Sequence, residues 1–342
     1  MNITVLAGGL SPEREVSLSS GSLIANALAE NGHKVLLLDV YEGLAELPDD
    51  PMTLFGRNRS EFFRVRESVP DLDALRERVG NGDALIGRNV LEICRLSDAV
   101  FLALHGASGE NGQVQAALDC FGVRYTGSGY DGSLLAMDKD LAKRLFRDAG
   151  VRTPDWMIYR VGSDSREAIL RSVGLPCVVK PLNCGSSVGV SMVESAEELN
   201  DALNVAAQYG TRVLVEKKIT GRELAVGILG ERVLPPVEII PKEGFYDYRN
   251  KYQGNTEEIC PADLPRETVE CLSDQCKRAF NALRLRGYAR FDFILDREGR
   301  PWCLEANTLP GMTPTSLLPQ EAQAVGISYR ALCEIILRFA LG

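Results

Sequence analysis

The chain has little of what marks zinc proteins, disulfide-bonded proteins and membrane proteins. Only two histidines occur in 342 residues, which excludes a zinc site built from several histidines. The nine cysteines are an odd number without a Cys-x-x-Cys pair, and no signal peptide is recognisable, so we expect reduced thiols in a cytoplasmic protein. No apolar run is long enough to span a bilayer.

The charge pattern excludes further partners. The formal net charge is −9 and no dense run of lysine and arginine occurs, so we expect neither nucleic acid nor an anionic membrane as a partner. A length of 342 residues predicts two or three domains, and 45% apolar residues are enough to fill their cores. This composition favours a globular enzyme that acts on small molecules.

Alternating strands and helices open the chain. Residues 2–7 have the pattern of a strand, 16–30 of a helix and 33–39 of a second strand, which predicts a parallel, Rossmann-like sheet. The glycine turn after the first strand does not complete Gly-x-Gly-x-x-Gly, so a dinucleotide fingerprint is not supported. Glu15 lies where the helix begins, at the mouth of the sheet, and either contacts a ligand or stabilises the helix dipole.

Two loops that follow strands carry candidate ligand groups. His105 comes after the buried strand 99–104 and before several glycines, which indicates a ligand-facing loop or a structural cap. Lys180 lies in the strand 175–181, and the glycine and hydroxyl residues at 185–187 can close over phosphates with their N–H groups. The loop is not a Walker A sequence, so the alternative is a plain glycine-rich hairpin.

The next strands have features suited to a nucleotide. The strand 211–216 ends in an extended segment that can offer a backbone donor and acceptor to an adenine edge. An acid a few residues later can accept hydrogen bonds from ribose hydroxyls. The long polar and aromatic segment 244–256 predicts a mobile lid.

The C-terminal third contains a predicted β-hairpin formed by residues 288–295 and 302–308. If Asp296 pairs with Pro301, one face of this hairpin is wholly apolar and belongs to the core. The predicted apolar pairs are Phe291 with Ala306, Phe293 with Leu304, and Leu295 with Trp302.

The other face of the hairpin is polar. The same register places Arg290 opposite Asn307 and Asp292 opposite Glu305. Two facing carboxylates repel each other, and a hard cation such as Mg2+ between them would remove that repulsion. We therefore predict a metal site at Asp292, Glu305 and Asn307; the alternative is a solvated polar face. The following loop, 310–317, can present N–H groups and a hydroxyl to an anion.

Taken in order, these segments resemble the D-alanine:D-alanine ligase family, which are ATP-grasp enzymes of bacterial cell-wall synthesis. The resemblance covers nearly the whole chain, and six weak motifs in the same order are together very specific. The matching motifs are residues 8–18, 105–112, 137–139, 180–189, 246–252 and 305–317.

The resemblance implies an α/β ATP-grasp fold in three parts. These are an N-terminal Rossmann-like domain at 1–132, a central part at 133–215 and a C-terminal catalytic part at 216–342, the last two enclosing ATP. It also implies ATP as co-substrate, two Mg2+ or Mn2+ per site, and a homodimer. The implied ATP contacts are Lys139, Lys180, Ser187, Glu216, Lys217, Ile219, Glu223 and Lys251, and the implied metal ligands are Asp292, Glu305 and Asn307.

The family chemistry joins two D-alanines for peptidoglycan synthesis. ATP phosphorylates the carboxylate of the first D-alanine, and the amine of the second attacks the acyl phosphate. By resemblance, Arg290 and the Gly311 N–H stabilise the tetrahedral oxyanion, and Ser186 joins Glu15 and Tyr252 in a set that closes the lid. The implied substrate contacts are Glu15 and His105 for the first D-alanine, and Lys251, Arg290, Ser316 and Leu317 for the second.

One departure and several alternatives accompany this assignment. Where the family usually has Gly-Glu-Asp-Gly, this chain has Asn111 after Glu110, which removes a charge near the first subsite. Enzymes that join D-alanine to D-serine or D-lactate are the nearest alternative, and the lid residues 251–252 and Leu317 favour D-alanine. A nucleotide-binding regulatory module and an NAD oxidoreductase are disfavoured by the intact site residues and the missing fingerprint.

Overall fold

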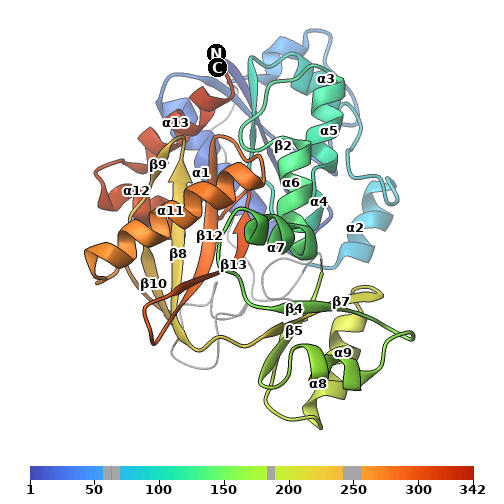
Figure 1. Ribbon diagram of the computed structural model, residues 1–342. Helices are drawn as coiled ribbons and strands as arrows, with labels where there is room; N and C mark the ends of the chain where they lie inside the picture. The colour runs from blue at the N-terminus through green and yellow to red at the C-terminus, as the bar shows by residue number, and fades with distance from the viewer. Residues whose placement is uncertain (57–62, 64–69, 183–188, 242–255) are drawn as a thin grey trace.

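Three β-sheets organise the molecule (Figure 1). The computed structural model describes residues 1–56, 63, 70–182, 189–241 and 256–342. Helices and strands alternate along much of this chain, and the α/β class expected from the sequence is confirmed. Within the described ranges, no helix combines the length and the apolar character needed to cross a membrane.

The first sheet is parallel, with strand order β2-β1-β3. Its strands β1 (Asn2–Ala7) and β3 (Ala99–Leu102) are almost completely buried, as expected for a parallel sheet covered by helices. The predicted Rossmann-like start of the chain is therefore confirmed. The remaining elements here are β2 (Lys34–Asp39), α1 (Arg14–Glu30), a 3-10 turn at Pro51–Leu54, α2 (Leu72–Val79), α3 (Val90–Arg95), α4 (Ala107–Glu110) and α5 (Gln113–Cys120).

The second sheet is antiparallel and follows two linking helices, α6 (Tyr130–Met137) and α7 (Lys139–Asp148). Its strand order is β4-β7-β5-β6. Apolar side chains of α8 and α9 share one core cluster with its strands, so these helices cover one face (Figure 1). The elements are β4 (Trp156–Arg160), α8 (Arg166–Ser172), β5 (Cys177–Pro181), β6 (Ser191–Val193), α9 (Glu198–Ala207) and β7 (Arg212–Lys217).

The third sheet is antiparallel, with order β11-β10-β8-β12-β13 and β9 beside β8. Helices α7 and α11 pack on its apolar face, and α12 lies over part of the opposite face through Leu317. The elements are β8 (Gly221–Leu229), β9 (Arg232–Val233), β10 (Val237–Pro241), β11 (Thr256–Ile259), α11 (Arg266–Ala282), β12 (Tyr288–Asp296), β13 (Pro301–Asn307) and α12 (Leu317–Ala324).

The predicted hairpin is β12 with β13, but its predicted register is only partly right. Pairing at Arg290, Phe291 and Asp292 is as predicted, with Asn307, Ala306 and Glu305 as the respective partners. Beyond Asp292 the prediction is wrong, because a β-bulge at Leu304 shifts the pairing by one residue. The observed pairs there are Phe293 with Cys303, Ile294 with Trp302 and Leu295 with Pro301.

The bulge changes which side chains fill the core. Cys303, not Leu304, is buried with Phe293 on the apolar face. Trp302 is half-buried and donates its indole N–H to the Asp296 carboxylate at 2.8 Å. The polar pairs lie before the bulge and keep their predicted places.

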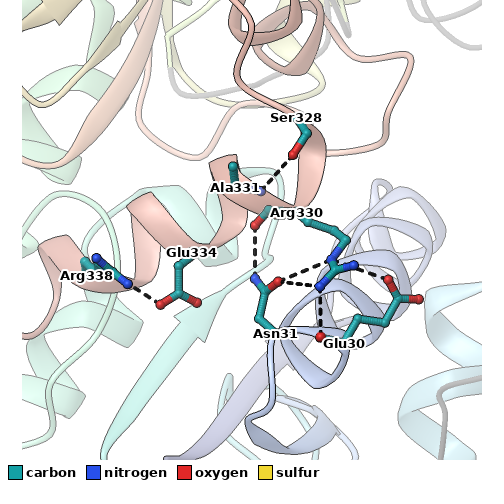
Figure 2. Close-up of a pocket in the computed structure, with 7 residues that line it drawn as sticks. All are labelled: Glu30, Asn31, Ser328, Arg330, Ala331, Glu334 and Arg338. Carbon is teal, nitrogen blue, oxygen red and sulfur yellow. Dashed lines mark hydrogen bonds and ion pairs between the residues drawn. The ribbon is translucent and has the colours of Figure 1, made fainter.

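The final helix, α13 (Tyr329–Phe339), packs against α1 of the first sheet. Leu332 and Ile336 share a core cluster with Ile24 and Leu28. At the edge of this contact, Arg330 donates to the Glu30 carbonyl at 2.8 Å and to Asn31 Oδ1 at 3.0 Å (Figure 2). Figure 2 shows the surface pocket at this edge, where the polar groups of Glu30, Asn31 and Arg330 pair with one another.

The division into domains stays a prediction. Strand β7 continues to Lys217, two residues beyond the predicted boundary at 215. Helix α13 follows the third sheet in sequence but packs on the first. The C-terminal helix therefore connects the third sheet, which precedes it in sequence, to the first sheet.

Candidate active site

Three buried charged side chains form a cluster on the second sheet. The Glu216 carboxylate on β7 pairs with Lys180 on β5, 2.5 Å from Oε1, and with Lys143 on α7, 2.9 Å from Oε2. Lys143 also donates to Thr153 Oγ1 at 2.6 Å and is fully buried. The structure thus brings together two predicted ATP contacts and adds Lys143, which the sequence analysis missed.

The electrostatics of this cluster suit an anion. Burial alone would raise the pKa of Glu216, but Lys143 and Lys180 outweigh it and the pKa falls below its usual value. Burial lowers the pKa of Lys143, and Glu216 only partly offsets this. A phosphate-bearing ligand next to Lys180 would oppose the effect of burial and favour the charged form of Lys143.

The segment predicted to contact adenine lies at the end of β7. The Lys217 N–H donates to the Asp155 carbonyl at 2.8 Å, and the next N–H, of Lys218, donates to the Pro176 carbonyl at 3.1 Å. Ile219 follows as a half-buried residue, and Glu223 lies on β8 between Ile239 and Ile294 in the neighbouring strands. The nucleotide roles of Lys217, Ile219 and Glu223 stay predictions.

On the polar face of the hairpin, each facing acid has a basic partner. Arg290 donates to Asp292 from Nε at 2.8 Å and from Nη2 at 2.9 Å. Asn307 Nδ2 donates to the same carboxylate at 3.0 Å. Lys139, the first residue of α7, places Nζ 3.3 Å from Glu305 Oε2. These two cations relieve the repulsion between the two acids.

The donor set of this face fits a hard divalent cation. It offers two carboxylates on paired residues and an amide, the ligands that Mg2+ takes together with water and substrate phosphates. Among the described residues, no group of three or more His, Cys, Asp or Glu side chains is close enough to hold a metal by itself. A cation here would therefore need ligands from the substrate as well.

A clamp formed by His105 and Glu110, which follow β3 of the first sheet, holds the loop after β13. His105 Nδ1 lies 3.1 Å from the Leu309 carbonyl, and the Leu309 N–H donates to Glu110 Oε1 at 3.2 Å. The other Glu110 oxygen accepts from the Gly106 N–H at 3.0 Å, and Ser20 Oγ lies 3.2 Å from His105 Nε2. These bonds fill both ring nitrogens of His105, as the structural-cap alternative requires; its predicted substrate contact stays a prediction.

The clamp residues have shifted pKa values. Burial lowers the pKa of His105, which favours a neutral ring that donates from Nδ1 to Leu309 and accepts from Ser20. Burial, followed by the charge of Glu13, raises the pKa of Glu110 to about 8, although the N–H groups of Leu309 and Gly106 act in the opposite direction. We therefore expect the strength of the clamp to change with pH.

The loop after the clamp brings Gly311 and Ser316 together. A Cβ on Gly311 would lie 2.9 Å from Ser316 Oγ, so a larger residue would displace that hydroxyl. Ser316 Oγ accepts from the Thr313 N–H at 3.1 Å and lies 2.8 Å from Thr313 Oγ1. Leu317 begins α12 and is buried against β8 and β10.

Other predicted site residues have partly known positions. Glu15 is buried in the first turn of α1, beyond the end of β1. Most of the predicted lid at 244–256 lies outside the described residues. So do the predicted site residues Ser186, Ser187, Lys251 and Tyr252. The roles of these residues stay predictions.

Comparison with known proteins identifies the family. The family model described as "D-ala D-ala ligase C-terminus" matches residues 145–338, and the one described as "D-ala D-ala ligase N-terminus" matches residues 2–128. The chain belongs to the D-alanine–D-alanine ligase family. A D-alanine–D-alanine ligase of Pediococcus pentosaceus is 39% identical over 342 residues, covering 98% of this chain and 96% of the relative.

Solved structures of ligases have the same fold. The D-alanine–D-alanine ligase from Bacillus anthracis complexed with ATP has a TM-score of 0.76 and 29% identity, covering 100% of this chain and 97% of its own. The VanG D-Ala:D-Ser ligase from Enterococcus faecalis has a TM-score of 0.77 and 25% identity, covering 99% of both chains. The predicted ATP-grasp fold is confirmed.

Replacing Lys143 tests the buried cluster. In Lys143→Met, the Glu216–Lys180 pair remains but one positive charge is lost, so we expect the KM for ATP to rise about tenfold, about 1.4 kcal/mol. Steady-state kinetics with varied ATP measure this. Arg147→Met, on the exposed side of the same helix, is the matched control. An unchanged KM would contradict a role of Lys143 in the nucleotide site.

Replacing Glu110 tests the clamp. Because its pKa is raised from 4.5 to about 8, the folded protein keeps a proton that the unfolded chain releases between these pH values. This stabilisation is complete below about pH 4.5 and is lost as the pH rises to about 8. Relative to Glu110→Gln, the wild type should lose stability over that range, as denaturant unfolding at several pH values would show.

The control for this measurement is Glu92→Gln, which changes an exposed acid of the same domain. Its unfolding free energy should stay parallel to that of the wild type. Parallel curves for Glu110→Gln as well would refute the raised pKa of Glu110.

Proposed function

We propose that this chain ligates two D-alanines with ATP, supplying D-alanyl-D-alanine for peptidoglycan precursors. Two family models and relatives at about 39% identity over nearly the whole chain support this reaction. The ATP complex of the Bacillus anthracis ligase supports ATP as co-substrate. The structural observation that carries the proposal is the hairpin face where Arg290, Asp292 and Asn307 contact one another.

The reaction needs an activated carboxyl group, because a free carboxylate is a poor electrophile. The γ-phosphoryl group of ATP passes to a carboxylate oxygen of the first D-alanine, and ADP leaves. The amine of the second D-alanine then attacks the acyl carbon. Its nitrogen forms the peptide bond, the bond to the phosphate oxygen breaks, and phosphate and a proton are released.

Residues of the described site have separate tasks in this scheme. Lys180, held by Glu216, places an ammonium group near the phosphates. Arg290 and the Gly311 N–H stabilise the oxyanion formed when the amine attacks. The His105 and Glu110 clamp supports this by fixing Leu309, two residues before Gly311.

The hairpin acids would hold the divalent cations. Asp292, Glu305 and Asn307 would bind Mg2+ or Mn2+, and the resemblance supports two ions per site. When bound, such ions neutralise charge on the transferred phosphoryl group. The protein's part is to offer two acids whose present partners, Arg290 and Lys139, are themselves suited to bind anionic groups.

The remaining assignments extend the same scheme. By resemblance to the family, Ser186, Tyr252 and Glu15 would form a hydrogen-bonded set that closes the lid over the acyl phosphate. Ser187 and Lys251 would approach the phosphates. Further assigned ATP contacts are Lys139, Lys217, Ile219 and Glu223, and assigned second-substrate contacts are Lys251, Arg290, Ser316 and Leu317.

We also propose a homodimer in the cytoplasm. The eight cysteines in the described part of the chain are all free thiols, as expected in a reducing compartment. The family resemblance supports the dimer, and light scattering of the purified protein tests it.

The choice of second substrate is the first functional test. The enzyme should release phosphate with ATP and D-alanine alone. Adding D-serine or D-lactate should neither speed up phosphate release nor give a product that contains D-serine or D-lactate. Buried Leu317 supports this preference, because it places an apolar side chain at the start of α12. Mass spectrometry of the products decides the matter, and a main product containing D-serine or D-lactate would overturn the preference.

Replacing Arg290 tests its place in the reaction. Arg290→Ala should lower kcat by at least about a hundredfold, as removal of an oxyanion donor does, while ADP affinity changes little. Coupled phosphate release and calorimetry measure the two quantities. Arg300→Ala, at the exposed turn of the same hairpin, should retain wild-type rates. Full activity of Arg290→Ala would remove its proposed role.

A further inference from the structure

Glu321 on α12 is a buried acid to which neither the sequence nor the proposed mechanism gives a task. Its side chain has 0% exposure, and within the described part of the chain neither Oε1 nor Oε2 has a hydrogen-bond partner. Burying a carboxyl group without donors destabilises a fold. Such a group therefore calls for a reason other than packing.

The position of Glu321 relative to the hairpin supplies that reason. A Cβ added to Gly227 would lie 2.2 Å from Glu321 Oε2, so the carboxyl group occupies the space left by this glycine. Gly227 on β8 pairs directly with Arg290 on β12. Directly paired residues project to the same face of a sheet. The Glu321 carboxyl therefore lies on the face that carries Arg290.

The charges around Glu321 point to the same neighbour. Burial raises its pKa well above the usual value, and Asp292 adds to this. Arg290 acts against burial and lowers the pKa. Arg290 is thus the cation whose field acts on the Glu321 carboxyl.

We propose that Glu321 is a positioning residue that shares the Arg290 guanidinium with Asp292. In the structure, Arg290 gives Nε and Nη2 to Asp292. When Asp292 turns its oxygens to a divalent cation, the Glu321 carboxyl group offers acceptor oxygens that keep the Arg290 guanidinium in place. The inference rests on the proposed function, because this exchange matters only where Asp292 binds a cation and Arg290 acts on the substrate.

A structural role alone predicts a different result. Replacing an unpaired buried acid with an apolar residue of similar size is often neutral or stabilising. If Glu321 only filled space, Glu321→Leu would keep or raise the melting temperature and leave metal binding and kinetics unchanged. A positioning role instead predicts that stability and function separate.

The test compares Glu321→Leu and Glu321→Gln with the wild type in the full-length enzyme. Gln323→Leu, on the exposed side of the same helix, is the matched control. Mn2+ affinity in the presence of ADP is measured by electron paramagnetic resonance of free Mn2+. Melting temperature, kcat and the KM for the second D-alanine are measured alongside.

For Glu321→Leu we expect an unchanged or higher melting temperature, a roughly tenfold loss of Mn2+ affinity and a roughly tenfold higher KM for the second D-alanine. The affinity falls because Arg290 then remains on Asp292 and competes with the ion. Glu321→Gln keeps an acceptor oxygen, so its Mn2+ affinity and KM should lie between those of the wild type and Glu321→Leu. Gln323→Leu should match the wild type in both.

Wild-type Mn2+ affinity and KM in Glu321→Leu would overturn the proposal. Should that variant fail to fold, Glu321→Gln carries the test, and wild-type values there would overturn the proposal as well. The proposed function fails separately, if the wild type forms no dipeptide from ATP and D-alanine. The Mn2+ measurement needs no turnover and still tests whether Glu321 and Asp292 share Arg290.

Discussion

Two acids face each other across β12 and β13, and the need to neutralise them shapes the surrounding structure. Arg290 satisfies Asp292 from the same strand, and Lys139 reaches Glu305 from the start of α7. One turn later on α7, Lys143 pairs with Glu216 on the second sheet. Since residues four apart lie on the same face of a helix, α7 presents one lysine to each antiparallel sheet. This helix therefore links the proposed metal ligands Asp292 and Glu305 to the proposed nucleotide contacts Glu216 and Lys180.

The first sheet reaches the site by a different route. Its loop after β3 holds the backbone of Leu309 at both ends, with His105 on the carbonyl and Glu110 on the N–H. Because the oxyanion donor proposed at Gly311 follows within two residues, small shifts of this loop would move it. Packing of α13 on α1 adds a second, apolar connection between the same parts of the molecule. The geometry of the reacting centre thus depends on all three sheets.

The sequence predicts what alternation and local spacing encode. The sequence could predict that Asp292 and Glu305 face each other, because polar residues recur at every second position in both strands of the hairpin. The bulge could not, because Cys303 and Leu304 are both apolar and the pattern does not distinguish a one-residue shift. The four-residue spacing of Lys139 and Lys143 indicates that both lie on one face of a helix. It does not reveal the partner of Lys143, because Glu216 is distant in sequence and periodicity carries no information about such contacts. The proposed role of Glu321 could not be predicted for the same reason, because it depends on contacts with Gly227 and Arg290, which are distant in sequence.

The buried charges also explain how the free protein can be stable and still receive charged ligands. Two lysines, Lys143 and Lys180, share the single carboxylate of Glu216. On the hairpin, Asp292 and Glu305 face each other, and the Glu321 carboxyl group lies on the face that carries Arg290. A polyphosphate suits the first cluster and a divalent cation the second, and the two ligands attract each other. Binding then exchanges partners among groups that are already ordered, instead of desolvating free charges. Preorganised ion pairs of this kind lower the cost of assembling the site, because the ordering of side chains is complete before substrate arrives.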